Sequence, residues 1–161
     1  MKEFSGELTM SIEEGPYYKT GSPERTNIAE PGTSGEKLII EGYVFDRNGN
    51  RIPNAWLDFW HADGNGVYDN TGYNLRGHQH TDETGHYYLV TIRPLEYGPR
   101  TSHVHVKVQA NDNSPILTTQ LFFPEHRKNQ SDRLFNKSLV MDVVDTEDGK
   151  KATFNFVVDV E

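Results

Sequence analysis

Short segments rich in β-branched and aromatic residues, each followed by a turn signal, recur along most of this chain. Strands are expected at residues 38–45, 55–60, 87–92, 103–109, 117–123 and 153–160, with tight turns at Asn48-Gly49 and Asp148-Gly149. Helical signals are weak and confined to one or two turns within 131–138. This pattern predicts an all-β fold, an antiparallel β-sandwich with little helix.

The first part of the chain differs in composition from the rest. Residues 1–36 are rich in Gly, Pro, Ser, Thr and Glu and show no sustained period, which indicates an extended N-terminal arm with turns. A chain of 161 residues fits one domain. We therefore expect residues 37–161 to form the β-sandwich and residues 1–36 to pack on it as an arm.

Composition excludes several classes of function. The chain has no cysteine, which rules out disulfides, thiolate metal sites and cysteine nucleophiles. A net charge of −8 argues against nucleic acid and anionic membranes as partners, and no apolar run approaches the roughly 20 residues of a membrane span. The N-terminus shows no signal-peptide pattern, so we expect a cytoplasmic location, with secretion left open.

The segment His103–Gln109 carries the clearest chemical signal. Alternate residues of a strand share a face, so its three valines are expected to point into the core and His103 and His105 to point the other way. The two histidines are then about 7 Å apart at Cα, a spacing at which both imidazoles can bind one metal ion. Surface strands also carry such pairs by chance, so the pair alone does not establish a site.

A second pair with the same spacing, His78 and His80, offers an alternative. With the carboxylates of Asp63, Asp69, Asp82 and Glu83 it could form the zinc or iron site of a hydrolase. However, these carboxylates lie next to Asn and Gly, as turn residues do, and no valine face backs the pair. The segment is therefore interpreted as a solvated junction between a loop and a strand.

Tyrosine favours the first pair as the metal site. A phenol has a pKa near 10 and normally keeps its proton, but a bound trivalent metal holds it as phenolate. Hard phenolate oxygens suit Fe(III) better than Zn(II) or Cu(I). Tyr97 precedes His103 by one loop and is therefore a candidate ligand, although a loop-anchoring aromatic is the alternative interpretation.

Several stretches, taken in order and spacing, resemble the intradiol ring-cleavage dioxygenases, the family of catechol 1,2-dioxygenases and protocatechuate 3,4-dioxygenases. The resemblance runs from about Glu14 to Phe123, most of the chain. It rests on Glu14-Gly15-Pro16-Tyr17-Tyr18, Ile52–Trp60, Gly66-Val67-Tyr68, Leu75-Arg76-Gly77, Thr81-Asp82 with Gly85, Thr91-Ile92-Arg93-Pro94, Tyr97, Arg100–His105 and Thr119–Phe123.

The resemblance implies roles for particular residues. Tyr68 would be a permanent iron ligand, Tyr97 would be the ligand that leaves when substrate binds, and His103 and His105 would complete the site. Other positions would contact the substrate or the ligands: Arg100 beside the substrate ring, Gln120 as a neighbour that orients the ligands, and Glu14, Gly15, Pro16 and Tyr18 at the substrate mouth, with Tyr17 next to them.

The resemblance also implies an activity. The chain would be a non-haem enzyme with one Fe(III) per chain that cleaves a catechol between its two hydroxyls with O₂, giving a cis,cis-muconate-type product. The alternative is a β-sandwich module that binds a small ligand or carbohydrate without turnover, which would not need two tyrosines and two histidines. The loop from Tyr97 to His103 is shorter than in the well-known enzymes, and their N-terminal helical extension is missing. The particular catechol and the oligomeric state therefore stay open, a homo-oligomer included.

Overall fold

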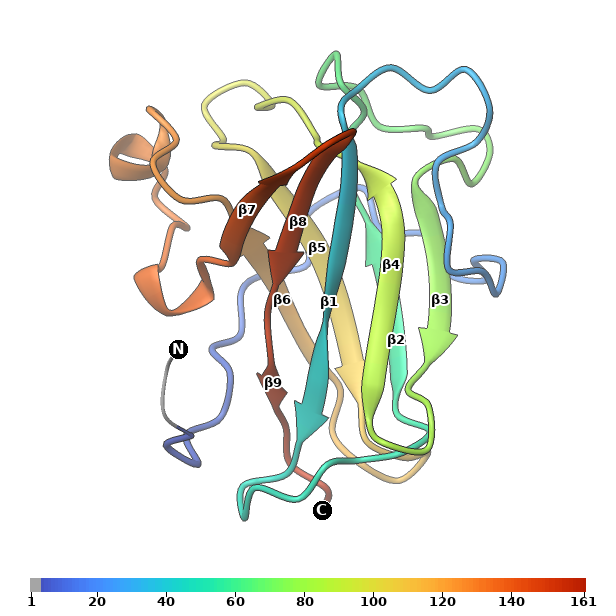
Figure 1. The fold of residues 1–161 in the computed structure, drawn as a ribbon, viewed down its shortest axis with the longest axis vertical. Helices are drawn as coiled ribbons and strands as arrows, with labels where there is room; N and C mark the ends of the chain where they lie inside the picture. Colours follow the sequence, from blue (N-terminus) through green and yellow to red (C-terminus); the bar gives the residue numbers. More distant parts are fainter. Residues whose placement is uncertain (1–3) are drawn as a thin grey trace.

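The structure, a computed structural model, describes residues 4–161 and consists of two β-sheets packed face to face (Figure 1). The first sheet has the strand order β4-β1-β8-β7, with β9 paired to β1, and the second has the order β3-β2-β5-β6. The first sheet comprises β1 (Lys37–Phe45), β4 (His86–Ile92), β7 (Asp142–Thr146), β8 (Gly149–Thr153) and β9 (Phe156–Val157). The second comprises β2 (Trp56–Trp60), β3 (Arg76–His80), β5 (His103–Gln109) and β6 (Leu117–Phe122). The predicted all-β sandwich with little helix is confirmed.

The core lies between the two sheets and follows from the period-two pattern of the strands. In β1, Leu38, Ile40 and Val44 are fully buried, and they alternate with half-exposed or exposed residues. The valines of β5 are buried in the same way from the opposite sheet. Most strand pairs are antiparallel, but β1 pairs in parallel with β8, the second strand of the β7–β8 hairpin, and with β9. This parallel pairing was not predicted.

The N-terminal arm crosses the outer face of the second sheet. Its backbone bonds to β6 through Ile12, at 2.9 Å, and to β3 through Arg25, at 3.0 Å. Between these two anchors Gly15 passes over β5, and beyond them Ile28 bonds to β4 of the first sheet at 3.0 Å. The arm therefore covers a sheet face that would otherwise contact solvent, and polar side chains on that face become buried.

Several elements differ from the expectation. β3 is a strand where a loop-to-strand junction was expected, and β7 and β8 were not predicted because their residues are mostly polar and exposed. The final strand shortens to β9. The helical signal corresponds to two 3₁₀ turns, Asn129–Ser131 and Lys137–Leu139. Within residues 4–161 no helix is long and apolar enough to cross a membrane.

Candidate metal centre

Two histidines of β5 point away from the sandwich core, because the valines that alternate with them point into it. His103 and His105 are nevertheless each only 3% exposed, since the arm and neighbouring loops cover this face. The strand register places Trp60 of β2 and Gln120 of β6 on either side of His105. The indole of Trp60 stacks on the imidazole of His105, with ring centroids 4.8 Å apart.

Tyr68 reaches these histidines from the loop after β2. Asp63 shapes that loop, because its carboxylate accepts the backbone N–H groups of Asn65 and Val67 at 2.8 and 3.0 Å. The hydroxyl of Tyr68 then lies 2.8 Å from Nε2 of His105 and 3.2 Å from Nε2 of His103. The two Nε2 atoms are 3.1 Å apart. Three ligand-type atoms from two distant segments therefore converge on one buried point.

Burial sets the charge state of this cluster. It lowers the pKa of His103 to about 4, with a further contribution from the cationic Arg100, and it lowers the pKa of His105 well below its usual range. Burial also raises the pKa of Tyr68, although Arg100 and Arg76 act in the opposite direction. The histidines are therefore neutral at pH 7, and Tyr68 keeps its proton unless a cation binds beside it.

The donor set fits a hard trivalent metal ion. Nδ1 of His103 donates to the carbonyl of Thr101 at 2.7 Å, so its Nε2 presents a lone pair to the cluster. Two neutral imidazoles and an ionisable phenol suit Fe(III). In the described part of the chain, no group of three or more His, Cys, Asp or Glu side chains could hold a metal. In this cluster the third donor is the phenol oxygen of Tyr68.

Tyr97 stands beside this cluster, with its hydroxyl hydrogen-bonded to the hydroxyl of Tyr17 from the arm. Its ring packs edge-on against Tyr68, with centroids 5.8 Å apart, and Tyr17 in turn stacks on Tyr68 at 4.4 Å. Tyr97 is 37% exposed, much more than the buried Tyr68. The predicted four-residue set therefore divides into three atoms in mutual contact and a fourth residue held next to them at the cavity mouth.

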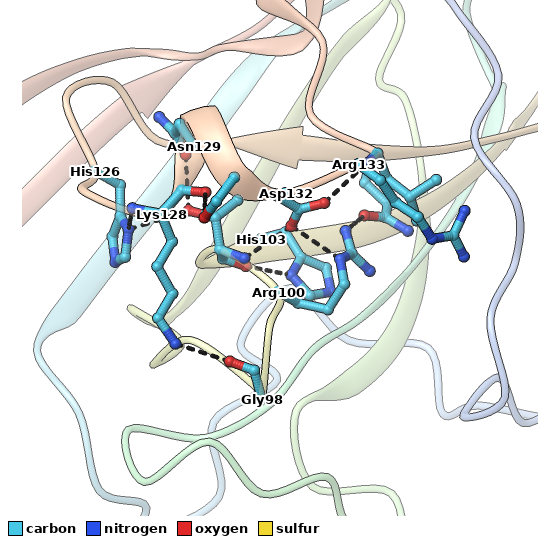
Figure 2. Close-up of polar contacts among 12 residues, drawn as sticks. Gly98, Arg100, His103, His126, Lys128, Asn129, Asp132 and Arg133 are labelled. Carbon is cyan, nitrogen blue, oxygen red and sulfur yellow. Dashed lines mark hydrogen bonds and ion pairs between the residues drawn. The ribbon is translucent and has the colours of Figure 1, made fainter.

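Arg100 and Gln120 lie on the same side of the cavity and contact each other. Nη2 of Arg100 donates to Oε1 of Gln120, and Nε of Arg100 donates to Oδ2 of Asp132 at 2.9 Å. The Asp132 side chain is fully buried and that of Arg100 is 18% exposed, so this ion pair is largely shielded from solvent. Figure 2 shows Arg100 beside His103 and Asp132. The guanidinium is therefore fixed by two partners next to the histidines.

A cavity of about 210 Å³ opens onto this cluster. It is smaller than the roughly 300–1,000 Å³ of typical drug-sized ligand sites, so its size is that of a site for a small ligand. Its walls include Glu13, Arg133 and Leu134, which the sequence did not indicate. Tyr17, which was expected next to the substrate mouth, also lines it. The lining from the predicted set is Gly15, Pro16, Tyr68, Tyr97, Arg100, His103, His105 and Gln120.

Some residues of the arm face the cavity, and their neighbours point away from it. Gly15 has φ +78°, and a Cβ there would lie 3.7 Å from Cε1 of His105, so the backbone passes close to the site. Glu14 turns away to pair with Lys107 at 2.7 Å, and Tyr18 donates to Asp58 at 2.8 Å. Glu14 and Tyr18, predicted at the substrate mouth, thus lie outside the cavity lining, and Tyr17 lies within it.

The second histidine pair lies within β3 at the far edge of the sheet. Nδ1 of His78 is 2.9 Å from the carbonyl of Ser22, and Nδ1 of His80 is 3.2 Å from the exposed carboxylate of Glu24. Their ring centroids are 6.0 Å apart, with planes nearly perpendicular. These contacts join β3 to the arm, so each histidine has a structural partner of its own.

Comparisons with known proteins show the family of this chain. The Dioxygenase family model matches residues 13–160. A catechol 1,2-dioxygenase of Acinetobacter baylyi is 36% identical in an alignment of 137 positions that covers 67% of this chain and 44% of that protein. The chain therefore spans less than half of that relative. It belongs to the intradiol ring-cleavage dioxygenase family.

Two solved structures resemble this chain in both fold and sequence. The dioxygenase domain of a dioxygenase and carbohydrate-binding protein fusion from Streptomyces sp. SirexAA-E is 45% identical, with a TM-score of 0.92 that covers 96% of this chain and 100% of that one. Hydroxyquinol 1,2-dioxygenase from Pseudomonas putida DLL-E4 is 27% identical, with a TM-score of 0.85 over 96% and 67% of the two chains.

Proposed function

We propose that this protein is a non-haem Fe(III) dioxygenase that cleaves a catechol-type ring between its two hydroxyls with O₂ and yields a cis,cis-muconate-type product. The observation that carries the proposal is the buried convergence of the Tyr68 hydroxyl with Nε2 of His103 and of His105. Family membership supports the reaction class. Relatives named catechol, chlorocatechol and hydroxyquinol 1,2-dioxygenases support an aromatic diol as substrate.

Tyr68, His103 and His105 would hold one iron per chain, with Tyr97 as the fourth ligand before substrate binds. When bound, Fe(III) would supply a Lewis acid for the two catechol oxygens and would make the ring reactive toward O₂. The neutral imidazoles need lose no proton, so only Tyr68 and Tyr97 have to ionise.

Tyr97 is placed to accept a proton from the substrate, and Tyr17 is placed to hydrogen-bond Tyr97. A catechol loses two protons when it chelates a metal through both oxygens. The oxygen of Tyr97, on leaving the ligand position that it would hold, would take one of them and would then share a hydrogen bond with the hydroxyl of Tyr17, the partner that it has in this structure. The second proton would pass to solvent at the mouth of the cavity. The exposed position of Tyr97 at the mouth leaves room for this movement.

Arg100 supplies a fixed positive charge beside the ring. Negative charge builds up on the ring as it reacts, and a guanidinium held on two sides by Asp132 and Gln120 stabilises that charge without having to reorganise. The contribution of such a preorganised donor is typically about 3–4 kcal/mol. Gln120 thereby orients Arg100.

Iron-dependent oxygen uptake tests the proposal. The protein, loaded with Fe(III), should be visibly red to burgundy from phenolate-to-iron charge transfer, and Tyr68→Phe should weaken that band. Oxygen uptake is then measured across catechol, hydroxyquinol, protocatechuate and chlorocatechols, with products identified by mass. At least one diol should gain both atoms of O₂. A colourless iron-loaded protein, or one that consumes no O₂ with any diol, contradicts the proposal.

A further inference from the structure

The segment of residues 125–132, which carries no recognisable motif, holds the loop between Tyr97 and His103 at both of its ends. Nζ of Lys128 donates to the carbonyl of Gly98 at 2.7 Å, near the start of the loop. Asp132 accepts the backbone N–H of Thr101 at 2.7 Å, near its end. Figure 2 shows this segment lying along the loop. The segment therefore determines where the residues of that loop point.

The two carboxylate oxygens of Asp132 accept hydrogen bonds from different parts of the chain. Oδ1 accepts the backbone N–H of Leu134 at 2.8 Å, a local turn contact of the kind that aspartate often makes. Oδ2 accepts Nε of Arg100 at 2.9 Å and the N–H of Thr101 at 2.7 Å. A role confined to the turn would need Oδ1 alone, so the second oxygen points to a role in the loop.

Thr101 connects Asp132 to His103 through hydrogen bonds. Its carbonyl accepts Nδ1–H of His103 at 2.7 Å, and its hydroxyl donates to Oδ1 of Asn129 at 2.7 Å. Thr101 is fully buried, and so is the side chain of Asp132. Fixing the Thr101 backbone therefore fixes the ring orientation of His103 and keeps its Nε2 lone pair directed at the cluster.

We propose that Asp132 is a positioning residue that orients both Arg100 and His103 toward the cavity, an inference that rests on the proposed function of that cavity. Its charge supports the role: burial opposes ionisation, but the N–H groups of Leu134 and Thr101 and the Arg100 guanidinium lower the pKa of Asp132 overall. Asp132 touches neither the substrate cavity nor the Nε2 atoms, so it acts through its neighbours.

The test compares Asp132→Asn with Glu125→Gln, a control that removes an exposed carboxylate from the same segment. In Asp132→Asn the amide has one oxygen for three N–H donors, so at least one donor loses its partner. In metal-free protein, the Thr101 amide should exchange with solvent at least about tenfold faster than in wild type. In iron-loaded protein, kcat should fall about 10- to 100-fold with a smaller change in KM.

The double variant Arg100→Ala/Asp132→Asn separates the effect of Asp132 on Arg100 from its effect on His103. If Asp132 acted through Arg100 alone, Asp132→Asn would cost nothing further in an Arg100→Ala background. Positioning of His103 as well predicts a smaller but measurable further loss. It also predicts a weaker Nδ1–H signal of His103 in ¹⁵N spectra of the metal-free Asp132→Asn protein.

One measurement needs no variant and covers the case in which Asp132→Asn does not fold. In the metal-free wild type, the Thr101 amide should exchange at least about tenfold more slowly than the exposed Glu125 amide. Equal rates there, or an Asp132→Asn protein that matches Glu125→Gln in exchange and in kcat, overturn the inference. If the wild type cleaves no diol, the proposed function fails, while amide exchange and the His103 spectrum still decide the role of Asp132.

Discussion

The indole of Trp60 lies nearly parallel to the imidazole of His105, with planes 8° apart and ring centroids separated by 4.8 Å. Trp60 is almost fully buried and forms one wall of the His105 site. We expect Trp60→Ala to lose roughly 3–5 kcal/mol of unfolding free energy, measured by urea denaturation of the metal-free protein. Trp60→Phe, which keeps a ring beside His105, should lose much less. Trp56→Ala, on the same strand but only half-buried, is the control, and a loss as large there would show that the stacking is not special.

The hydroxyl of Tyr17 provides a second test. Tyr17→Phe removes the partner of Tyr97 but keeps the ring that stacks on Tyr68. A neutral hydrogen bond contributes about 1 kcal/mol, so KM for the diol should rise roughly fivefold while iron content stays constant. Tyr73→Phe is the matched control, because Tyr73 also donates one hydrogen bond to the arm, 2.9 Å to the carbonyl of Thr20. Equal KM values in both variants would contradict the role of Tyr17.

Loss of Arg100 should slow the reaction with oxygen more than it weakens binding of the diol. Chelation depends on the metal and the two diol oxygens, whereas Arg100 acts on charge that develops later. We expect Arg100→Ala to retain the iron colour and to slow single-turnover decay of the enzyme–diol complex in O₂ by about 10²- to 10³-fold. Arg100→Lys should not restore the rate fully, because an ammonium lacks the fork that reaches Asp132 and Gln120. Unchanged decay with a collapsed diol affinity would assign Arg100 to binding.

Acid stability away from the cavity should depend on Asp46. Its carboxylate accepts the N–H groups of Asn48 and Asn50, each at 2.9 Å, and these backbone hydrogen bonds lower its pKa. The lowered pKa means that its stabilising effect is complete above the unfolded-state pKa and is lost as the pH falls through the folded-state value. Asp46→Asn should therefore lower Tm at about pH 7 and make little difference at about pH 2.

The control for this pH test is Asp112→Asn, which changes an exposed turn carboxylate. Its Tm should follow that of the wild type at both pH values. A destabilisation by Asp46→Asn that is equally large at low and neutral pH would mean that the charge of Asp46 is not the cause.

The sequence predicts local periodicity well and long-range contacts poorly. The alternation of valine and histidine in β5 is a property of one strand, so the outward direction of His103 and His105 followed from spacing alone. Tyr68 lies 35 residues before His103 and meets it through the topology of the sheet. Only the resemblance to a family could bring it into the set in advance.

The arm shows where sequence reasoning fails. Neighbouring residues of an extended chain point to opposite sides, so a choice between Tyr17 and Tyr18 requires knowing which side of the arm faces the cavity. That side is fixed by contacts such as Tyr17 with Tyr97, 80 residues away. Arg133 and Leu134 were missed because their segment has no periodic pattern, and β7 and β8 because edge strands need no apolar alternation.

The path of the arm across the second sheet has a consequence for biosynthesis. The carbonyl of Met10 accepts the hydroxyl of Thr119, and these residues are 109 positions apart. A ribosome adds about 5–20 residues per second, so the arm waits on the order of 5–20 s before β6 emerges to receive it. During that interval it must neither aggregate nor pair with another chain. The composition of residues 1–36, rich in Gly, Pro, Ser, Thr and Glu, favours a nascent segment that stays unstructured until its docking surface exists.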